Sequence, residues 1–518
     1  MRENRIIYFI FLLTIFLLFL KSDFRIINEL KCCQDDYDYY SHAMTIVQDF
    51  DFDYTNQFES KERFYKNNKI APIGFFGSGL LAAPFLGIGN LLDTFFNTDQ
   101  NILTFKKLIY SFSSIFYLFI SINLLNYSFN FLKYRYLLAI SVFGSGIIYY
   151  SFERFSMTHT YEVFTISLIF YFLEKYYISE KKNLYAILIP LAFLLSFLVR
   201  WTNYYIVFLP YIFKTLLSKN SGISLFKNYY FYISSIISVF LFALHTKLIY
   251  GKVVFYPTYI YKQNIGTETI NVIKSDFMGL LINFINDSVI ILFTQEFGIF
   301  WFSPLIFIGF LFSIFKLLKS ERSKKNAYFL AVICYLQCFM IISLWNTTAS
   351  SYGFRYLFSL IPLSVFLLKV LLDEYQNKFV KNYLFIFSIF GILSVLFFES
   401  NLGTQLSLVP IENSFGIEVV YSQPKYLTGI FGAFVEIESY LKIFATSFLG
   451  AIFFKIVLSI LSKDRFLEIL RIFGNTSENE DLNILLNKIE IITVDKFLIS
   501  IIFSLLIVKY FLYFIKKN

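Results

Sequence analysis

Residues 1–23 read MRENRIIYFIFLLTIFLLFLKSD, with two arginines ahead of an apolar run over residues 6–20. This layout is typical of a first membrane-spanning helix whose N-terminus lies in the cytoplasm. A signal peptide has a similar layout, but no small-x-small cleavage motif follows, and LKCC is a poor lipobox. We therefore expect an uncleaved first span.

Apolar runs of similar length recur along all 518 residues. The chain is 57% hydrophobic and 16% charged, with a mean hydropathy of +0.62, which lies outside the range of soluble globular proteins. The predicted fold class is all-α: a polytopic transmembrane helix bundle of about thirteen spans, as one domain over residues 1–461. Residues 462–518 are predicted to form a cytoplasmic amphipathic segment and the last span. The predicted spans are 6–20, 108–125, 136–150, 161–173, 184–199, 204–217, 229–244, 297–318, 328–345, 356–372, 383–398, 443–461 and 497–514.

The net charge of +9 comes from basic residues in short loops after every second span. This is the positive-inside pattern of membrane proteins, so we expect no nucleic-acid partner. It places three long loops outside, at residues 21–107, 250–296 and 399–441, and it disagrees only with Lys516 and Lys517, which thirteen spans leave outside. Within the first loop, residues 71–96 are apolar but rich in glycine and contain Pro72 and Pro84. We expect this segment to lie in the interface or to re-enter, rather than to span.

The first outer loop concentrates carboxylates, with six aspartates in residues 34–56, QDDYDYYSHAMTIVQDFDFDYTN. Four apolar residues recur there at helical spacing: Tyr40, Ala43, Met44 and Val47. They predict a short helix on the membrane surface, with Asp35 and Asp36 at its N-terminal end, where the helix dipole favours carboxylates. Adjacent helical residues point about 100° apart, so one can act while the other orients a partner. From Asp49 onward we expect a solvated loop.

The order of these segments resembles the GT-C superfamily of polytopic glycosyltransferases, which includes protein O-mannosyltransferases, aminoarabinose transferases of lipid A and Rgt-type lipopolysaccharide-core transferases. The shared mark is an acidic pair after the first helix, here Asp35 and Asp36, where many relatives have Asp-Glu. The resemblance covers roughly residues 1–372. Its further motifs are Gln48–Asn56, Pro72-Ile73-Gly74, Ala83-Pro84-Phe85, MTHTYEVF (Met157–Phe164), VRWTNYYIVFLP (Val199–Pro210), GIFWFSPLIFIG (Gly298–Gly309) and YGFRYLFSLIPL (Tyr352–Leu363).

The resemblance implies transfer of a sugar from a polyprenyl-phosphate donor to an acceptor hydroxyl on the outer face, with inversion. Asp35 or Asp36 would be the catalytic base, and the choice between them stays open. Glu153 would be a second acid at the acceptor, or would pair locally with Arg154. Five residues are candidates to bind the donor phosphate: Arg154, His159, Arg200, Lys262 and Arg355. Each arginine could instead reach lipid headgroups, and His159 could be a capped structural residue.

The implied partners are the lipid-linked donor, a glycan, lipid or protein acceptor, and membrane lipids. We expect no required metal, although some relatives hold Mg²⁺ or Mn²⁺ on such carboxylates. The expected location is a bacterial plasma membrane, with the active site outside the cytoplasm. An O-antigen-type polymerase or ligase is the second reading, and a transporter is a further alternative, although the predicted spans carry few ionisable residues. A non-catalytic scaffold would leave Asp35 and Asp36 freely replaceable.

Overall fold

The structure is a computed structural model. It describes residues 34–58, 65–66, 69–72, 74–98, 104–131, 134–217, 225–255, 277–294, 298–345, 352–375, 377–402, 407–412, 418–423, 448–462 and a few positions between 464 and 509. The predicted first span, Lys262 and most of the predicted segment 462–518 lie outside these residues.

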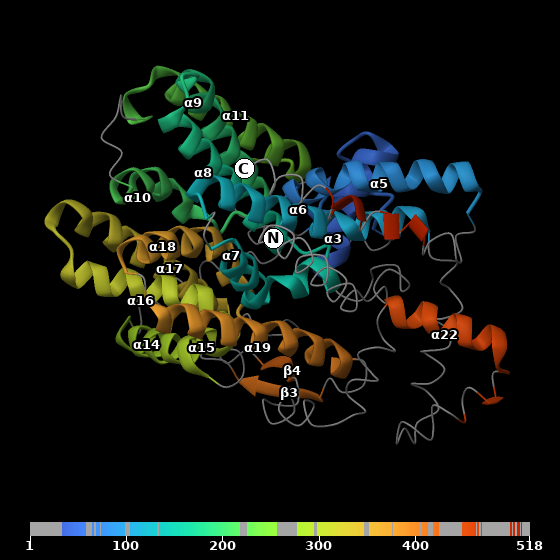
Figure 1. The fold of residues 1–518 in the computed structure, drawn as a ribbon. Helices are drawn as coiled ribbons and strands as arrows, with labels where there is room; N and C mark the ends of the chain where they lie inside the picture. The colour runs from blue at the N-terminus through green and yellow to red at the C-terminus, as the bar shows by residue number, and fades with distance from the viewer. Residues whose placement is uncertain are drawn as a thin grey trace.

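The described part of the chain is a bundle of helices (Figure 1). Its longer helices are α5 (Gly77–Phe96), α6 (Phe105–Phe129), α8 (His159–Ile178), α9 (Lys182–Val199), α11 (Tyr229–Tyr250), α16 (Pro304–Lys319), α17 (Arg322–Trp345), α18 (Ile361–Glu374), α19 (Lys378–Leu402) and α22 (Phe448–Ile460). Two antiparallel ribbons accompany them, β1 (Tyr65–Lys66) with β2 (Lys69–Ile70), and β3 (Ser407–Glu412) with β4 (Glu418–Gln423). The predicted all-α fold class is confirmed.

Seven helical stretches in the described residues are long and apolar enough to cross a membrane, and three shorter apolar helices accompany them. A bundle with this many apolar helices, several of them largely exposed, needs lipid around it. The chain is therefore an integral membrane protein, as its composition predicts.

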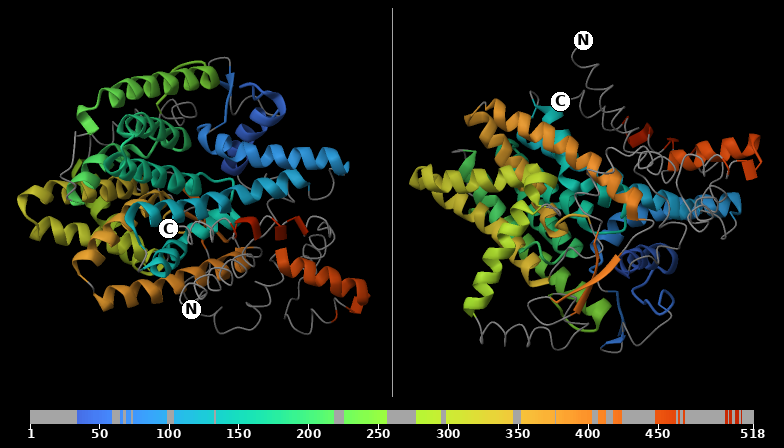
Figure 2. Two further views of the ribbon diagram at one scale, coloured as in Figure 1. Left: turned by 45° about the horizontal axis from the view of Figure 1, so that its top comes forward. Right: turned by 90° about the horizontal axis from the view of Figure 1, so that it is seen from below.

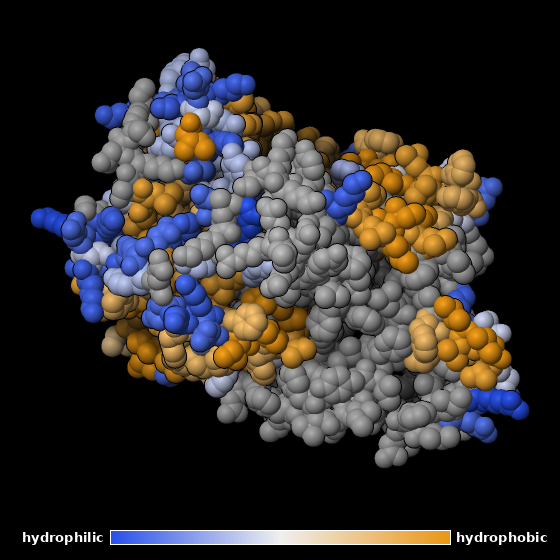
Figure 3. Space-filling view, in the orientation of Figure 1, coloured by the Kyte–Doolittle hydropathy of each residue, from blue (hydrophilic) through white to orange (hydrophobic). Residues whose placement is uncertain are grey.

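Basic residues gather at one end of the bundle, which we call the lysine-rich end. It consists of the turns between α8 and α9, between α16 and α17, and between α18 and α19. Figure 3 shows hydrophilic residues over the first two of these turns, at the top and left edges. The 20-residue α8 is about 30 Å long, so its first residue, His159, lies well away from this end.

Several predicted spans are regular helices only over part of their length, and the irregular part lies away from the lysine-rich end. The span predicted at 136–150 is α7 (Arg135–Val142) followed by the π turns η2 (Phe143–Ile147) and η3 (Tyr149–Glu153). The span at 297–318 is split at Ser303 into α15 (Ile299–Phe302) and α16. Those at 204–217 and 356–372 open with the 3₁₀ turns η4 (Tyr204–Phe208) and η6 (Arg355–Leu360), before α10 (Leu209–Leu216) and α18.

One expectation about the outer loops is wrong. Residues 250–296 are not all loop, because they contain α14 (Phe277–Phe293), a 17-residue apolar helix. Its sequence is apolar except for a few polar residues, of which Asp287 is charged. Ser343 of α17 donates a hydrogen bond to Asp287, which gives this carboxylate a partner between the two helices. Residues 77–96 form the continuous helix α5, which passes through Pro84 without a break.

Helix α5 packs side by side with α6 as a helical hairpin (Figures 1 and 2). The Asp93 carboxylate of α5 accepts hydrogen bonds from the backbone N–H groups of Phe105 and Lys106, at 2.7 and 2.8 Å. It therefore caps the first turn of α6 with a negative charge, where the helix dipole favours one. The outer face of α5 is apolar and exposed, with Leu91 and Phe95 more than 70% accessible, as the patch over α5 in Figure 3 shows.

We expect Gly146→Ala to lower the free energy of unfolding by about 2 kcal/mol or more. Gly146 has φ 88°, and a Cβ there would lie 2.8 Å from the ring of Tyr352. Gly87→Ala is the matched control, because its nearest neighbours would be Val47 methyls at 3.9 and 4.0 Å. An alanine inside helix α5 should stabilise by about 0.5–1 kcal/mol. Denaturant unfolding in detergent measures both, and an equal effect at the two positions would contradict the assignment.

Candidate active site

The predicted surface helix of the first loop exists, as α3 (Gln34–Met44), extended by the π turn η1 (Thr45–Asp49). Tyr40 and Ala43 of the predicted apolar stripe are buried against α5 and α6. Asp36 lies in the first turn of α3, as predicted. The loop beyond is solvated, also as predicted, because Asp51 and Asp53 are exposed.

A histidine to which the sequence assigned no role fixes the position of α3. His42 is buried, and its Nε2 lies 2.8 Å from the carbonyl oxygen of Gly74. Since a carbonyl can only accept, Nε2 carries the proton and Nδ1 accepts from the Tyr54 hydroxyl at 2.6 Å. Tyr250 at the end of α11 also donates to the Gly74 carbonyl, at 2.9 Å. The Tyr39 ring packs so closely on Gly74 that a Cβ there would lie 2.0 Å from it.

Asp36 forms a buried ion pair with Arg154. Nη2 of Arg154 lies 2.7 Å and Nε 3.2 Å from the same carboxylate oxygen of Asp36, and both side chains are 2% exposed. Arg154 ends the π turn η3, so an irregular helix end presents its guanidinium to the helix of the first loop. Two residues that the sequence singled out separately are thereby brought together across 118 positions.

A second buried cluster surrounds Arg200, directly after α9. Nη1 of Arg200 donates to Thr158 Oγ1 at 2.9 Å and to Glu162 Oε1 at 3.0 Å, and lies 3.2 Å from Nδ1 of His159. The guanidinium carbon sits 4.0 Å from the ring centre of Tyr356, a cation–π contact. Burial is the largest single influence on Arg200 and lowers its pKa, but Glu162, Tyr356 and Tyr39 together outweigh it and raise the pKa of Arg200 above its usual value.

Helix α3 connects the two clusters. It places Asp36 against Arg154, and Tyr39, three positions later, within electrostatic reach of Arg200. Arg355, the first residue of η6, lies 5.7 Å from the Tyr356 ring on the other edge of the second cluster and acts electrostatically on His159. Two buried carboxylate–arginine pairs, Asp36 with Arg154 and Glu162 with Arg200, therefore lie on either side of this part of α3, and Arg355 lies beside the second.

Such an arrangement can stabilise an anion and hold a carboxylate ready for a proton. Guanidinium groups bind phosphate through paired N–H donors, and exclusion of water strengthens each charge interaction. Among the described residues, no group of three or more His, Cys, Asp or Glu side chains is arranged to hold a metal ion.

Comparison with known proteins adds a distant structural neighbour. This chain is similar to an archaeal oligosaccharyltransferase. The likeness is to the crystal structure of the Archaeoglobus fulgidus enzyme in the apo form, at 14% sequence identity and a TM-score of 0.38, over 84% of this chain. The match takes in 55% of that protein, so this chain spans about half its length. No family model and no curated protein matches the sequence.

Of the remaining predicted site residues, the structure describes the side chain of Glu153 but not those of Asp35 and Lys262. Glu153 is buried next to Arg154, at 1% exposure. Asp35 has its backbone in the first turn of α3, but its side chain and all of Lys262 lie outside the described residues. Sequence reasoning missed Thr158, Glu162 and Tyr356. The only signal for Glu162 was its place one turn after Thr158 in MTHTYEVF.

We expect His42 to contribute to the pH dependence of stability. Burial lowers the pKa of His42 from its usual 6.5 to about 3. Between these values the unfolded chain binds a proton that the folded chain does not, so stability is complete above about pH 6.5 and falls as the pH drops. The slope reaches about 1.4 kcal/mol per pH unit for one proton. Thermal unfolding from pH 7.5 to 4.5 should show a shallower slope for His42→Gln than for wild type, and parallel slopes would contradict the prediction.

Proposed function

We propose that this protein is a membrane glycosyltransferase. It moves a sugar from a polyprenyl-phosphate donor to an acceptor hydroxyl, with inversion, and Asp36 is the general base. The observation that supports this most directly is the buried pair of Asp36 with Arg154, next to the cluster of Arg200. The same loop carries the acidic pair through which the sequence resembles the GT-C glycosyltransferases.

The roles follow from what each group can do. The acceptor oxygen attacks the anomeric carbon as the bond from that carbon to the phosphate oxygen breaks, and the phosphate leaves with the electron pair. Asp36 takes the acceptor's proton. Arg154, Arg200 and Arg355 stabilise the charge on the departing phosphate. Because Arg154 is paired with Asp36, a phosphate that engages Arg154 frees the carboxylate for the acceptor.

The proposed site is extracytoplasmic. His159 begins α8 and Arg200 follows α9, and the other ends of these two helices are joined by a lysine-rich turn. Arg154 follows the helical run that starts next to Tyr134, whose hydroxyl accepts a hydrogen bond from Lys381 at the lysine-rich end. By the positive-inside rule the lysine-rich end faces the cytoplasm, so the site opens on the outer side of what we take to be a bacterial plasma membrane. The acceptor is a glycan, lipid or protein reached from that side, and the reaction as written requires no Mg²⁺ or Mn²⁺.

Reconstituted transfer tests this function. Purified protein in liposomes would receive a panel of radiolabelled polyprenyl-phosphate sugars and an extract of outer-envelope acceptors. We expect label in the acceptor and release of one polyprenyl phosphate per sugar transferred. A ladder of growing glycan on the lipid would favour the polymerase reading. Transfer from a soluble nucleotide sugar without lipid donor would contradict the proposal.

A further inference from the structure

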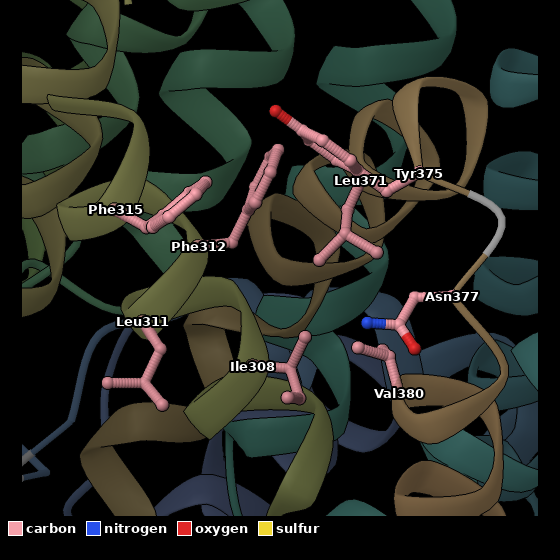
Figure 4. Close-up of a pocket in the computed structure, with 8 residues that line it drawn as sticks. All are labelled: Ile308, Leu311, Phe312, Phe315, Leu371, Tyr375, Asn377 and Val380. Atoms are coloured by element: carbon pink, nitrogen blue, oxygen red, sulfur yellow. The ribbon is translucent and has the colours of Figure 1, made fainter. Parts of the chain in front are cut away.

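A cavity lies at the lysine-rich end, far from the candidate site. It has a volume of about 270 Å³ and lies between α16, α18 and the start of α19 (Figure 4). Its wall is apolar, with Ile308, Leu311 and Leu371 pointing into the space that Figure 4 shows, and the Phe312 and Phe315 rings beside it. Two polar side chains complete the lining, Tyr375 and Asn377.

The cavity opens toward the surroundings of the bundle. Leu311 and Phe315, which line it, are each 41% exposed, and Leu318, one turn beyond Phe315, is 76% exposed. In a membrane protein, an apolar surface of this kind at the end of the spans meets the inner half of the bilayer. The molecules that reach the cavity most readily are therefore lipids.

Lysine ammonium groups stand over the aromatic part of the wall. Lys316 lies 4.9 Å from the Tyr375 ring centre and 5.9 Å from that of Phe312, and it donates to the Tyr375 hydroxyl at 3.2 Å. Lys319 lies 4.5 Å from the ring centre of Phe315. A ligand in the cavity therefore meets hydrocarbon inside and positive charge at the edge.

The charge around the cavity is positive on balance. Glu374 pairs with Lys316, and Asp373 pairs with Lys369. Residues 316–325 and 369–381, which form the two bordering turns, carry eight basic and three acidic side chains. Asn377 adds a donor, because its carbonyl oxygen accepts from the Phe379 N–H at 2.8 Å and its amide N–H₂ remains for a ligand.

We propose that this cavity binds one anionic phospholipid from the cytoplasmic leaflet. An acyl chain fills the space beside Ile308 and Leu371, and the headgroup phosphate meets Lys319 and the Asn377 amide. The apolar wall selects for hydrocarbon, and the surplus of positive charge selects for an anionic over a zwitterionic headgroup. The site is independent of the proposed transferase activity.

Native mass spectrometry of the full chain in mild detergent tests this proposal. The protein would be mixed with equal amounts of phosphatidylglycerol and phosphatidylcholine that carry the same acyl chains. We expect one retained lipid, mainly phosphatidylglycerol. Ile308→Phe, which fills the space, should reduce retention about tenfold, and Lys319→Gln should lower the ratio of phosphatidylglycerol to phosphatidylcholine about tenfold.

Matched variants serve as controls. Leu318→Phe adds volume on the exposed face of the same helix, and Lys325→Gln removes a charge from the same turn region. Both should keep one phosphatidylglycerol, and the melting temperature of each variant checks its folding. Equal retention of the two lipids by wild type, or unchanged retention by a folded Ile308→Phe, would overturn the proposal. So would lipid binding that appears only after residues 462–518 are removed, because the chain itself would then cover the cavity.

Discussion

Asp36→Asn is expected to lower the rate of sugar transfer by about 10²–10⁴-fold, the usual contribution of a general base. Asparagine keeps the size of the side chain but cannot take the acceptor's proton. The loss should fall on kcat, with a smaller effect on the KM for the lipid donor. Transfer measured in liposomes at saturating donor gives kcat directly. A folded Asp36→Asn protein with the wild-type rate would remove Asp36 from the mechanism.

Stability has to be separated from chemistry in this experiment. Asparagine at position 36 breaks the buried ion pair with Arg154, and breaking a buried pair typically costs about 3–5 kcal/mol. The double variant Asp36→Asn/Arg154→Gln removes both charges, so it should recover much of the stability but none of the activity. Asp51→Asn is the matched control, because Asp51 lies exposed in the same loop and should be replaceable without effect.

Glu162→Gln is expected to be strongly destabilising, by about 3–5 kcal/mol, because Glu162 is the buried countercharge of Arg200. Arg200→Gln alone should be similarly costly. The double variant should be more stable than the two single losses added together, with a coupling energy of about 1.5 kcal/mol or more. Denaturant unfolding of the four proteins in the same detergent measures this coupling. Additive losses would show that the two groups do not act as a pair.

The same cluster has an expected effect on donor binding. Arg200→Lys keeps the charge, but it loses the planar fork that reaches Thr158 and Glu162 and lies on Tyr356, so the KM for the donor should rise about tenfold with a smaller change in kcat. Glu174→Gln is the control, since Glu174 lies on α8, the helix of Glu162, near the lysine-rich end. It should change neither stability nor transfer appreciably.

Patterns in the sequence predicted helices whose formation depends on residues that lie close together along the chain. The stripe around Tyr40 and Ala43 marked α3 correctly, since an amphipathic helix shows itself within two turns. Most of the predicted spans correspond to helices in the described residues, because the length of an apolar run can be read from the sequence alone. The helix α14 was missed because Asp287 breaks its hydropathy, and its partner Ser343 lies 56 residues further along the chain. Pro84 does not break α5, because a proline inside an apolar helix is tolerated.

Individual residues of the candidate site could be predicted, but their contacts could not, because these contacts join residues far apart in the sequence. Asp36 could be named from the acidic stretch of the first outer loop and Arg154 from its place just after a predicted span, but their pairing joins residues 118 apart. No local pattern around Glu162 predicts that Arg200 is its partner, because that contact depends on how the end of α9 packs against the start of α8. His42 likewise depends on Gly74 and Tyr54, which only the folded first loop brings to it.

The Asp93 cap has a consequence for the order in which the protein assembles. Asp93 and its two N–H partners are 12 and 13 residues apart, so the α5–α6 hairpin can close as soon as both helices leave the ribosome. Asp36 is synthesised before either helix, but its partner Arg154 follows 118 residues later. Tyr250, which binds the Gly74 carbonyl, follows Gly74 by 176 residues. The loop that carries the proposed base is thus among the first segments translated, but its contacts are complete only after residue 250 has been made. A nascent chain released before residue 250 would hold a finished hairpin and an unfinished active site.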